Sequence, residues 1–209
     1  RAFAVALDRL PLDVASRPGF LVNRVLMPYL LEAVRMVEEG ISPPRVDAAA
    51  CDFGMPIGPI ELADTVGLDI CLAVAERLGV TFKLEVPASL RTHVAHKRLG
   101  KKSGAGFYKY NARGRPPRSW RSPAPEPALA ERLILRLLNE AMACLREGVV
   151  QNATAVDLGL VYGAGFAPFR GGPLGHAHSL GEQQLHHSLY RLAAQHGAGF
   201  NPDSGWTQL

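Results

Sequence analysis

The sequence lacks the features that define several classes of protein. No apolar run approaches the ~18 residues that a membrane-spanning helix needs. No Gly-x-Gly-x-x-Gly follows a predicted strand, and no phosphate-binding loop ends in Gly-Lys-Ser or Gly-Lys-Thr. A Gly-x-Ser-x-Gly elbow is also missing. The sequence therefore predicts neither a membrane span, nor a complete nucleotide-binding unit, nor an α/β-hydrolase nucleophile.

The cysteines and histidines do not have the spacing of a metal site. The 3 cysteines are an odd number without metal-ligand spacing, and each has apolar neighbours, which favours buried free thiols in a reducing compartment. Two histidine pairs are alternatives as ligands, but no cysteine or carboxylate cluster completes either of them. We therefore expect no metal site. The residues concerned are Cys51, Cys71, Cys144, His176, His178, His186 and His187.

The net charge of +4 is unevenly distributed, because residues 97–121 contain basic but no acidic residues. Tyr108, Tyr110 and Trp120 lie in the same stretch, which is a pattern of some nucleic-acid-binding segments. The stretch is also rich in glycine and proline and shows no nucleic-acid-binding fold. We interpret it as a solvated linker beside a phosphate-bearing ligand or an acidic partner domain, with no nucleic-acid partner.

Most of the chain shows helical periodicity with glycine after the last turn. Residues 101–125 break the pattern and predict a linker. The only strand signal is a short extended run at Leu12–Ala15. The sequence therefore predicts an all-α fold. The expected helices cover residues 21–37, 43–53, 60–66, 68–78, 89–99, 127–147, 155–161 and 183–195.

A tandem repeat divides the chain. Residues 31–41 align with residues 139–149, and a series of aspartates, glycines and prolines then follows in the same order in both copies. We therefore predict one helical unit over residues 17–100 and a second over 126–196. Units this small bury their apolar faces poorly alone, so they should pack on each other or on a partner. The later pairs are Asp47 with Asp157, Gly54 with Gly165, Pro59 with Pro173 and Gly67 with Gly181.

Asn23 is the clearest polar candidate. It follows Pro18-Gly19 in the first turns of a predicted helix, where asparagine is a mediocre helix former. Two interpretations remain open, a local capping contact and a side chain that faces a ligand. The Gly/Pro turns 54–59 and 166–173 also have two interpretations, chain reversal with close helix packing and an apolar wall for a substrate chain.

These segments resemble the C-terminal domain of 3-hydroxyacyl-CoA dehydrogenases. The motifs are RPGFLVNRVL (Arg17–Leu26), FGMPIGPIELAD (Phe53–Asp64) and KKSGAGFY (Lys101–Tyr108). The motif PFRGGP (Pro168–Pro173) is similar to the second copy of this domain in the alpha subunit of the multifunctional fatty-acid oxidation complex, which joins an enoyl-CoA hydratase to the dehydrogenase. The resemblance implies two tandem helical units of the 6-phosphogluconate dehydrogenase C-terminal-like type.

The resemblance also implies a function in fatty-acid β-oxidation. In the family, an N-terminal Rossmann domain binds NAD and carries a His–Glu pair that oxidises a (3S)-hydroxyacyl-CoA. That domain is absent here, so we expect the chain alone to be inactive. Asn23 corresponds to the family residue that positions the substrate beside the histidine. Phe20, Met55 and Pro56 would line the acyl chain, whereas the second unit, in which we align Leu133–Leu135 with Leu21–Asn23, would be non-catalytic.

The expected organisation follows from this resemblance. Residues 1–16 would be the end of the NAD-binding domain, 17–110 the first helical domain, 111–125 a linker and 126–209 the second helical domain. The start at Arg1, without methionine, is interpreted as a truncation. The expected partners are an acyl-CoA substrate, the missing Rossmann domain, a hydratase domain, a thiolase subunit and a second copy of the protein. The C-terminus, Trp206–Leu209, is not a peroxisomal signal, which favours the bacterial cytoplasm.

Two alternatives stay open. The chain could be purely a dimerisation or docking module that never touches substrate. It could also be another helical dehydrogenase tail, of the β-hydroxyacid or 6-phosphogluconate type. Those tails carry a catalytic lysine on the long helix, whereas residues 23–39 contain no lysine, which disfavours the second alternative.

Overall fold

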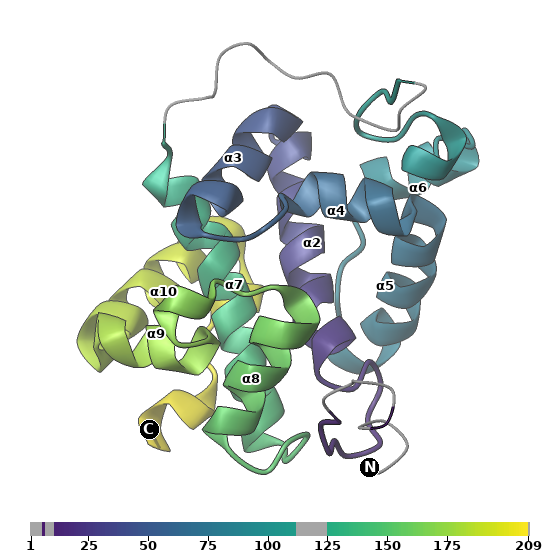
Figure 1. The fold of residues 1–209 in the computed structure, drawn as a ribbon. Coiled ribbons are helices and arrows are strands. Elements are labelled where there is room, and N and C mark those ends of the chain that lie inside the picture. Colours follow the sequence, from purple (N-terminus) through teal and green to yellow (C-terminus); the bar gives the residue numbers. More distant parts are fainter. Residues whose placement is uncertain (1–5, 7–10, 112–124, 209) are drawn as a thin grey trace.

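The computed structural model describes residue 6 and residues 11–111 and 125–208, and in these the regular structure is helical (Figure 1). Isolated bridges join Gly100 to Ala105 and Ala105 to Lys109, but the described residues form no strand. The predicted all-α class is confirmed. The helices are α2 (Val22–Glu38), α3 (Pro43–Phe53), α4 (Pro59–Val66), α5 (Leu68–Phe82), α6 (Ala88–Ala95), α7 (Pro127–Arg146), α8 (Ala153–Ala164), α9 (Pro173–Leu180) and α10 (Glu182–His196), with short 3₁₀ turns at Lys101–Ser103, Pro168–Arg170, Ala198–Phe200 and Ser204–Gln208.

Some predicted boundaries are wrong. Helix α6 ends at Ala95, before the residue predicted, because Lys97 adopts a positive φ of 58° that a helix cannot contain. Helix α9 is missing from the predicted helices, although Pro173 after Gly172 is a typical helix start. The extended run at 12–15 forms no ladder; the Ala15 N–H instead donates to the Val149 carbonyl at 2.8 Å.

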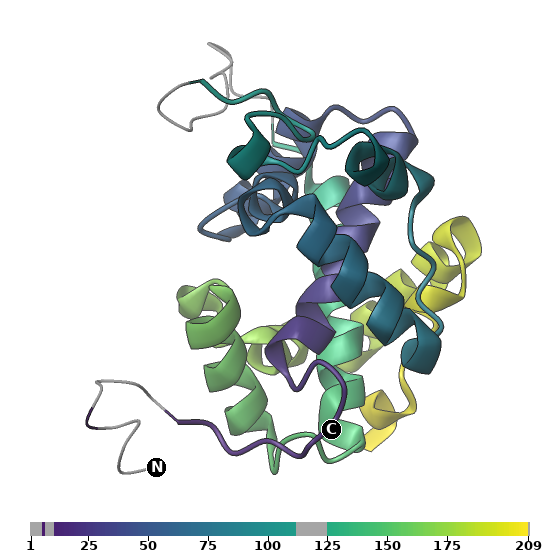
Figure 2. The ribbon, with the colours of Figure 1, turned by 90° about the vertical axis from the view of Figure 1, so that its right-hand side faces the viewer.

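Helices α2 and α7 form the centre of the molecule and run antiparallel (Figures 1 and 2). Both helices are apolar along the shared face, where Val25, Tyr29, Leu133 and Leu137 are fully buried. Burial of each such side chain contributes about 1.5–3 kcal/mol, so this helix pair supplies much of the hydrophobic stabilisation. The shorter helices pack around this pair. In chain order, α3 to α5 come after α2, and α8 to α10 come after α7.

The stretch 101–110 is part of the first helical half, and the prediction of a linker from residue 101 is wrong. Asp64, at the C-terminal end of α4 and fully buried, accepts hydrogen bonds from the Phe107 N–H at 3.0 Å and the Tyr108 N–H at 2.9 Å. The Tyr110 hydroxyl donates to the same carboxylate at 3.0 Å. The structure therefore joins this tail to α4. The remaining linker, residues 112–124, lies outside the described residues.

The two helices that follow the Gly/Pro turns start in the same way. Asp47 accepts hydrogen bonds from the first N–H groups of α4, at Ile60 (2.7 Å) and Glu61 (3.0 Å). In the other half, Asp157 accepts from Leu174 (2.7 Å) and Gly175 (3.2 Å) at the start of α9. A carboxylate at this position satisfies free N–H groups and stabilises the helix dipole.

We expect Gly58→Ala to lower the free energy of unfolding by about 1–3 kcal/mol. A Cβ at Gly58 would lie 2.2 Å from Asp47 Cβ, so the carboxylate that caps α4 would have to move. Gly175→Ala is the matched control, because its Cβ would meet nothing closer than 3.6 Å and alanine favours a helix. Urea unfolding of both variants measures the difference; equal midpoints would contradict the packing argument.

The prediction of buried free thiols is confirmed for two of the three cysteines and wrong for the third. Cys71 and Cys144 are buried free thiols as predicted, but Cys51 is exposed, because it lies on the outer face of α3. None of the helices in the described part of the chain has the length and apolar character that a bilayer span requires.

Candidate functional site

Asn23 lies in the first turn of α2 and its side chain is exposed. It makes no side-chain hydrogen bond to any described residue, and no side chain caps α2, so the local capping interpretation is not supported. Phe20, just before the helix, is 54% exposed and has a positive φ of 48°, a strained conformation for an aromatic residue. The start of α2 thus presents an exposed amide at Asn23, preceded by an exposed aromatic ring at Phe20.

The other two predicted site residues differ in exposure. Pro56 is exposed in the turn between α3 and α4, whereas Met55 is buried in the core at 5%. The end of α8 brings Pro56 close to the start of α2: a Cβ at Gly165 would lie 2.7 Å from Pro56, and one at Gly163 would lie 2.7 Å from Val22. We call Phe20, Asn23 and Pro56 the Asn23 surface.

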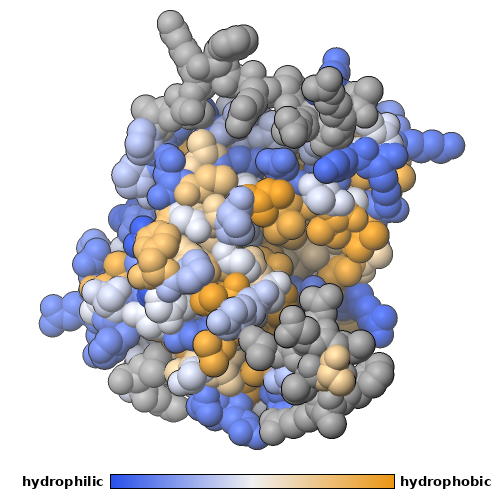
Figure 3. Space-filling view, viewed as in Figure 1, coloured by the Kyte–Doolittle hydropathy of each residue, from blue (hydrophilic) through white to orange (hydrophobic). Residues whose placement is uncertain are grey.

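Apolar side chains gather near this region. In the space-filling view they lie over α4 and the first turns of α5 (Figure 3). Val66 and Ile70, from the end of α4 and the start of α5, are 42% and 48% exposed. An exposed apolar area of this kind commonly marks a surface for a ligand or another domain.

Reciprocal ion pairs join α2 to α7. Arg24, 2% exposed, donates to Glu140 at 3.0 Å and to Glu147 at 2.5 and 2.9 Å. Arg132, 5% exposed, donates to Glu32 at 2.6 Å and to Glu39 at 2.6 and 2.7 Å. Each arginine is 108 positions from its counterpart, as are Glu32 and Glu140, and Glu39 and Glu147. The contacts are therefore related by an approximate two-fold axis between the antiparallel helices.

This spacing corrects the alignment of the two halves. The residue equivalent to Asn23 is Glu131, not Leu135, because Arg24 and Arg132 occupy equivalent positions. Glu131 accepts hydrogen bonds from the Ser188 hydroxyl at 2.6 Å and from Arg191 at 2.5 Å. The second half therefore has a bound carboxylate where the first half has a free amide.

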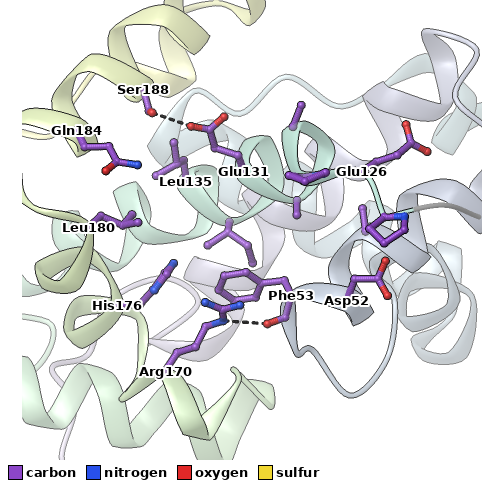
Figure 4. A pocket seen from close by; sticks show the side chains of 16 residues that line it. Asp52, Phe53, Glu126, Glu131, Leu135, Arg170, His176, Leu180, Gln184 and Ser188 are labelled. Carbon is purple, nitrogen blue, oxygen red and sulfur yellow. Dashed lines mark hydrogen bonds between the residues drawn. The ribbon is translucent and has the colours of Figure 1, made fainter.

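Glu131 lines a cavity of about 540 Å³ between α3, α7, α9 and α10 (Figure 4). Arg170 lies along the Phe53 ring, with its guanidinium carbon 4.0 Å from the ring centre and its Nε donating to the Phe53 carbonyl at 2.9 Å. The His176 ring packs against the same ring in a T-shaped arrangement, with centroids 5.1 Å apart, and both burial and Arg170 lower the pKa of His176. These contacts connect the two halves of the chain across the cavity.

Hydroxyls near histidine or carboxylate are not activated as nucleophiles here. Ser179 Oγ lies 3.5 Å from His176 Nδ1, but its hydroxyl donates to the His176 carbonyl at 2.7 Å. Ser188 donates to a carboxylate that already pairs with Arg191. The described residues also hold no cluster of three or more potential metal ligands.

Asp47 is a buried carboxylate whose pKa differs clearly from its usual value. Burial raises its pKa to about 6, against the opposing effect of hydrogen bonds from the Tyr108 hydroxyl at 2.7 Å and from Ile60 and Glu61. It lies beneath the tail and not at the Asn23 surface, so we assign it to stability.

The structure thus defines an all-helical protein with an exposed amide and no nucleotide-binding unit in its described residues. Residues 19–110 match the family "3-hydroxyacyl-CoA dehydrogenase, C-terminal domain". The matched segment is helical in the structure and contains no nucleotide-binding fold.

Solved structures show the same fold over more of the chain. The crystal structure of 3-hydroxybutyryl-CoA dehydrogenase from Escherichia coli K12 covers 99% of this chain at 23% identity, with a TM-score of 0.84. The dehydrogenase part of multifunctional enzyme 1 from C. elegans covers 100% at 21% identity, with a TM-score of 0.70. M. tuberculosis FadB2 covers 52% at 40% identity, with a TM-score of 0.50. The chain spans 62%, 53% and 40% of those three chains, respectively.

Sequence reasoning did not identify the charged residues that matter most to the assembly. Arg24, Arg132 and Glu32 lie among apolar residues on the buried faces of their helices, and a charge at such a position signals a buried pair. Their constant spacing of 108 residues was available in the sequence. Their partners, however, become evident only once the two helices are known to be antiparallel.

Proposed function

We propose that this chain is the substrate-completing and assembly part of an NAD-dependent (3S)-hydroxyacyl-CoA dehydrogenase of fatty-acid β-oxidation. The observation that carries the proposal is Asn23, a free amide on the exposed start of α2 within the matched segment. In the whole enzyme an N-terminal domain would bind NAD and supply the catalytic base. The chain by itself would then be inactive.

In this proposal Asn23 hydrogen-bonds to the substrate and holds it beside the base. An exposed amide offers both a donor and an acceptor, and holding a substrate in a reactive geometry is worth several kcal/mol of the barrier. Phe20 and Pro56 would contact the acyl chain, and the exposed apolar residues of α4 and α5 would face the NAD-binding domain. Met55, buried beside Pro56, would support this wall from the core.

Replacing Asn23 by alanine tests the proposal in the protein that contains the NAD-binding domain. We expect kcat for oxidation of a 3-hydroxyacyl-CoA to fall by about 100-fold, since the substrate loses its position beside the base. Stopped-flow measurement of NADH formation gives kcat and KM separately. The melting temperature should not change, because the Asn23 side chain is exposed and makes no hydrogen bond in the described structure.

Gln183→Ala is the control, since it removes an exposed amide from the first turn of α10 in the second half of the chain. This variant should retain full turnover. Normal turnover in Asn23→Ala would contradict the proposed role of Asn23 and would favour the alternative, a docking module that does not touch substrate.

In this proposal the second half of the chain has a structural role. Its counterpart of Asn23 is Glu131, whose carboxylate is already paired, and its reciprocal ion pairs join it to the first half. We propose that the two halves are tandem copies with boundaries at 17–110 and 126–209. A hydratase domain in the parent, a thiolase subunit, a homo-oligomer and a bacterial cytoplasmic location are proposals that rest on the family resemblance alone.

A further inference from the structure

A second cavity, of about 340 Å³, lies near the approximate two-fold axis. Pro28 of α2 and Arg136 of α7, which are equivalent at the spacing of 108, both line it. So do residues 82–85 at the end of α5 and residues 196–199 at the end of α10, which occupy corresponding places in the two halves. Figure 2 shows the end of α5 and the segment after α10 on the same side of the molecule. Both halves thus contribute walls to one cavity.

Arg136 is the unusual residue of this cavity. It is 8% exposed, yet its only described side-chain partner is Glu140, whose Oε2 lies 3.5 Å from Nη1. Charge-assisted bonds to arginine are normally about 2.7–2.9 Å long, and a guanidinium has five donors. No Arg136 nitrogen is both fully buried and without a partner. The remaining donors are therefore accessible from the cavity.

The glycine at position 199 allows this arrangement. A Cβ there would lie 3.3 Å from Arg136 Nε, so a larger residue would crowd the guanidinium. Burial lowers the pKa of Arg136 against the opposing effects of Glu140 and Glu32. A buried guanidinium without a close anion is a costly feature that a bound anion would relieve.

The neighbouring charges favour an anion. Arg35 and Lys83 line the same cavity, and Lys83 pairs with no acid among the described residues. The acids present are Glu32, which lies 2.5 Å from Arg132 and 3.6 Å from Arg35, and Glu85, which is 90% exposed and lies 3.5 Å from Arg35. His196 also lines the cavity, and burial and the nearby Arg132 lower its pKa. The lining thus holds three permanently charged cations, Arg35, Lys83 and Arg136, against the two carboxylates of Glu32 and Glu85.

We propose that this cavity binds a phosphate-type oxyanion, with Arg136 as its main ligand and Arg35 and Lys83 as supporting charges. A tetrahedral dianion presents enough oxygens to accept bonds from a guanidinium and an ammonium group at once. The cavity is several times larger than the ~30 Å³ that a water molecule occupies in the liquid, so the anion fits with part of its hydration or with the group that carries it.

Calorimetric titration of the 209-residue chain at constant ionic strength tests this. Inorganic phosphate and adenosine 3′,5′-bisphosphate serve as probes for a free anion and for the phosphate of a larger ligand. We expect saturable binding of one equivalent of at least one probe, weakened by about tenfold or more in Arg136→Met. The control is Arg91→Met, which removes an exposed arginine paired with Glu76 and should keep the wild-type affinity.

Lys83→Glu keeps the test decisive if Arg136→Met does not fold, because the Lys83 side chain is exposed. Charge reversal there should also weaken binding by about tenfold or more. The proposal is wrong if neither probe saturates, if binding is equal in wild type and Arg136→Met, or if Lys83→Glu binds as tightly as wild type. Saturation by phosphate itself would indicate a free anion, and saturation by the nucleotide alone would indicate a phosphate ester.

Discussion

Replacing Arg132 by methionine should lower the free energy of unfolding by about 3 kcal/mol. The substitution keeps most of the side-chain volume but removes the guanidinium that donates to Glu32 and Glu39. Glu32, 1% exposed, would then be a buried carboxylate whose nearest remaining cation is Arg35, at 3.6 Å. A buried charge without its close partner costs more than the pair contributed, because its desolvation is no longer offset.

The measurement is the urea unfolding midpoint, with the slope checked for constancy. Arg91→Met, at a pair exposed by about half on both sides, should change stability by less than about 1 kcal/mol. The double variant Arg132→Met with Glu32→Leu should recover most of the loss, because it removes both charges together. If Arg132→Met is as stable as wild type, the ion pairs do not hold α2 to α7.

The sequence predicted the helices of each half well because their signals are local. Apolar residues at helical spacing, Pro43 after an N-cap serine and Gly54 at the end define α3 to the residue. Prediction was less accurate at α6, since Lys97 in a positive-φ conformation has no sequence signal of the kind that glycine gives.

The candidate site stays a prediction that rests on a different kind of signal. Family resemblance selected Asn23, Phe20, Met55 and Pro56, and the structure adds their exposure and the contact of Pro56 with the end of α8. No local pattern reveals that Met55 points into the core while Pro56 does not. Contacts between residues more than 100 positions apart, such as Arg24 with Glu140, depend on how α2 and α7 pack. Such pairings are properties of the tertiary structure.

Replacing Asp64 by alanine should release the tail 101–110 from α4. Three donors would lose their acceptor, namely the N–H groups of Phe107 and Tyr108 and the Tyr110 hydroxyl. Each buried unsatisfied donor costs about 1–3 kcal/mol, so detachment of the tail becomes easier than leaving them unpaired. A loss of about 3 kcal/mol in local stability raises the population of the detached state by about two orders of magnitude.

Limited trypsin digestion measures this population, because Lys101 and Lys102 are cleavable only when the backbone around them opens. We expect cleavage after these lysines, identified by mass spectrometry, to accelerate by about 100-fold in Asp64→Ala. Asp69→Ala is the control: it removes the exposed pair between Asp69 and Lys102, at 2.5 Å, leaves the bonds to Asp64 in place, and should accelerate cleavage by less than about tenfold. Equal rates in the two variants would mean that the Lys102 contact holds the tail as strongly as the buried carboxylate does. Because a detached tail also leaves the Tyr108 hydroxyl away from Asp47, the same variant should weaken the start of α4, which directly follows the turn that presents Pro56.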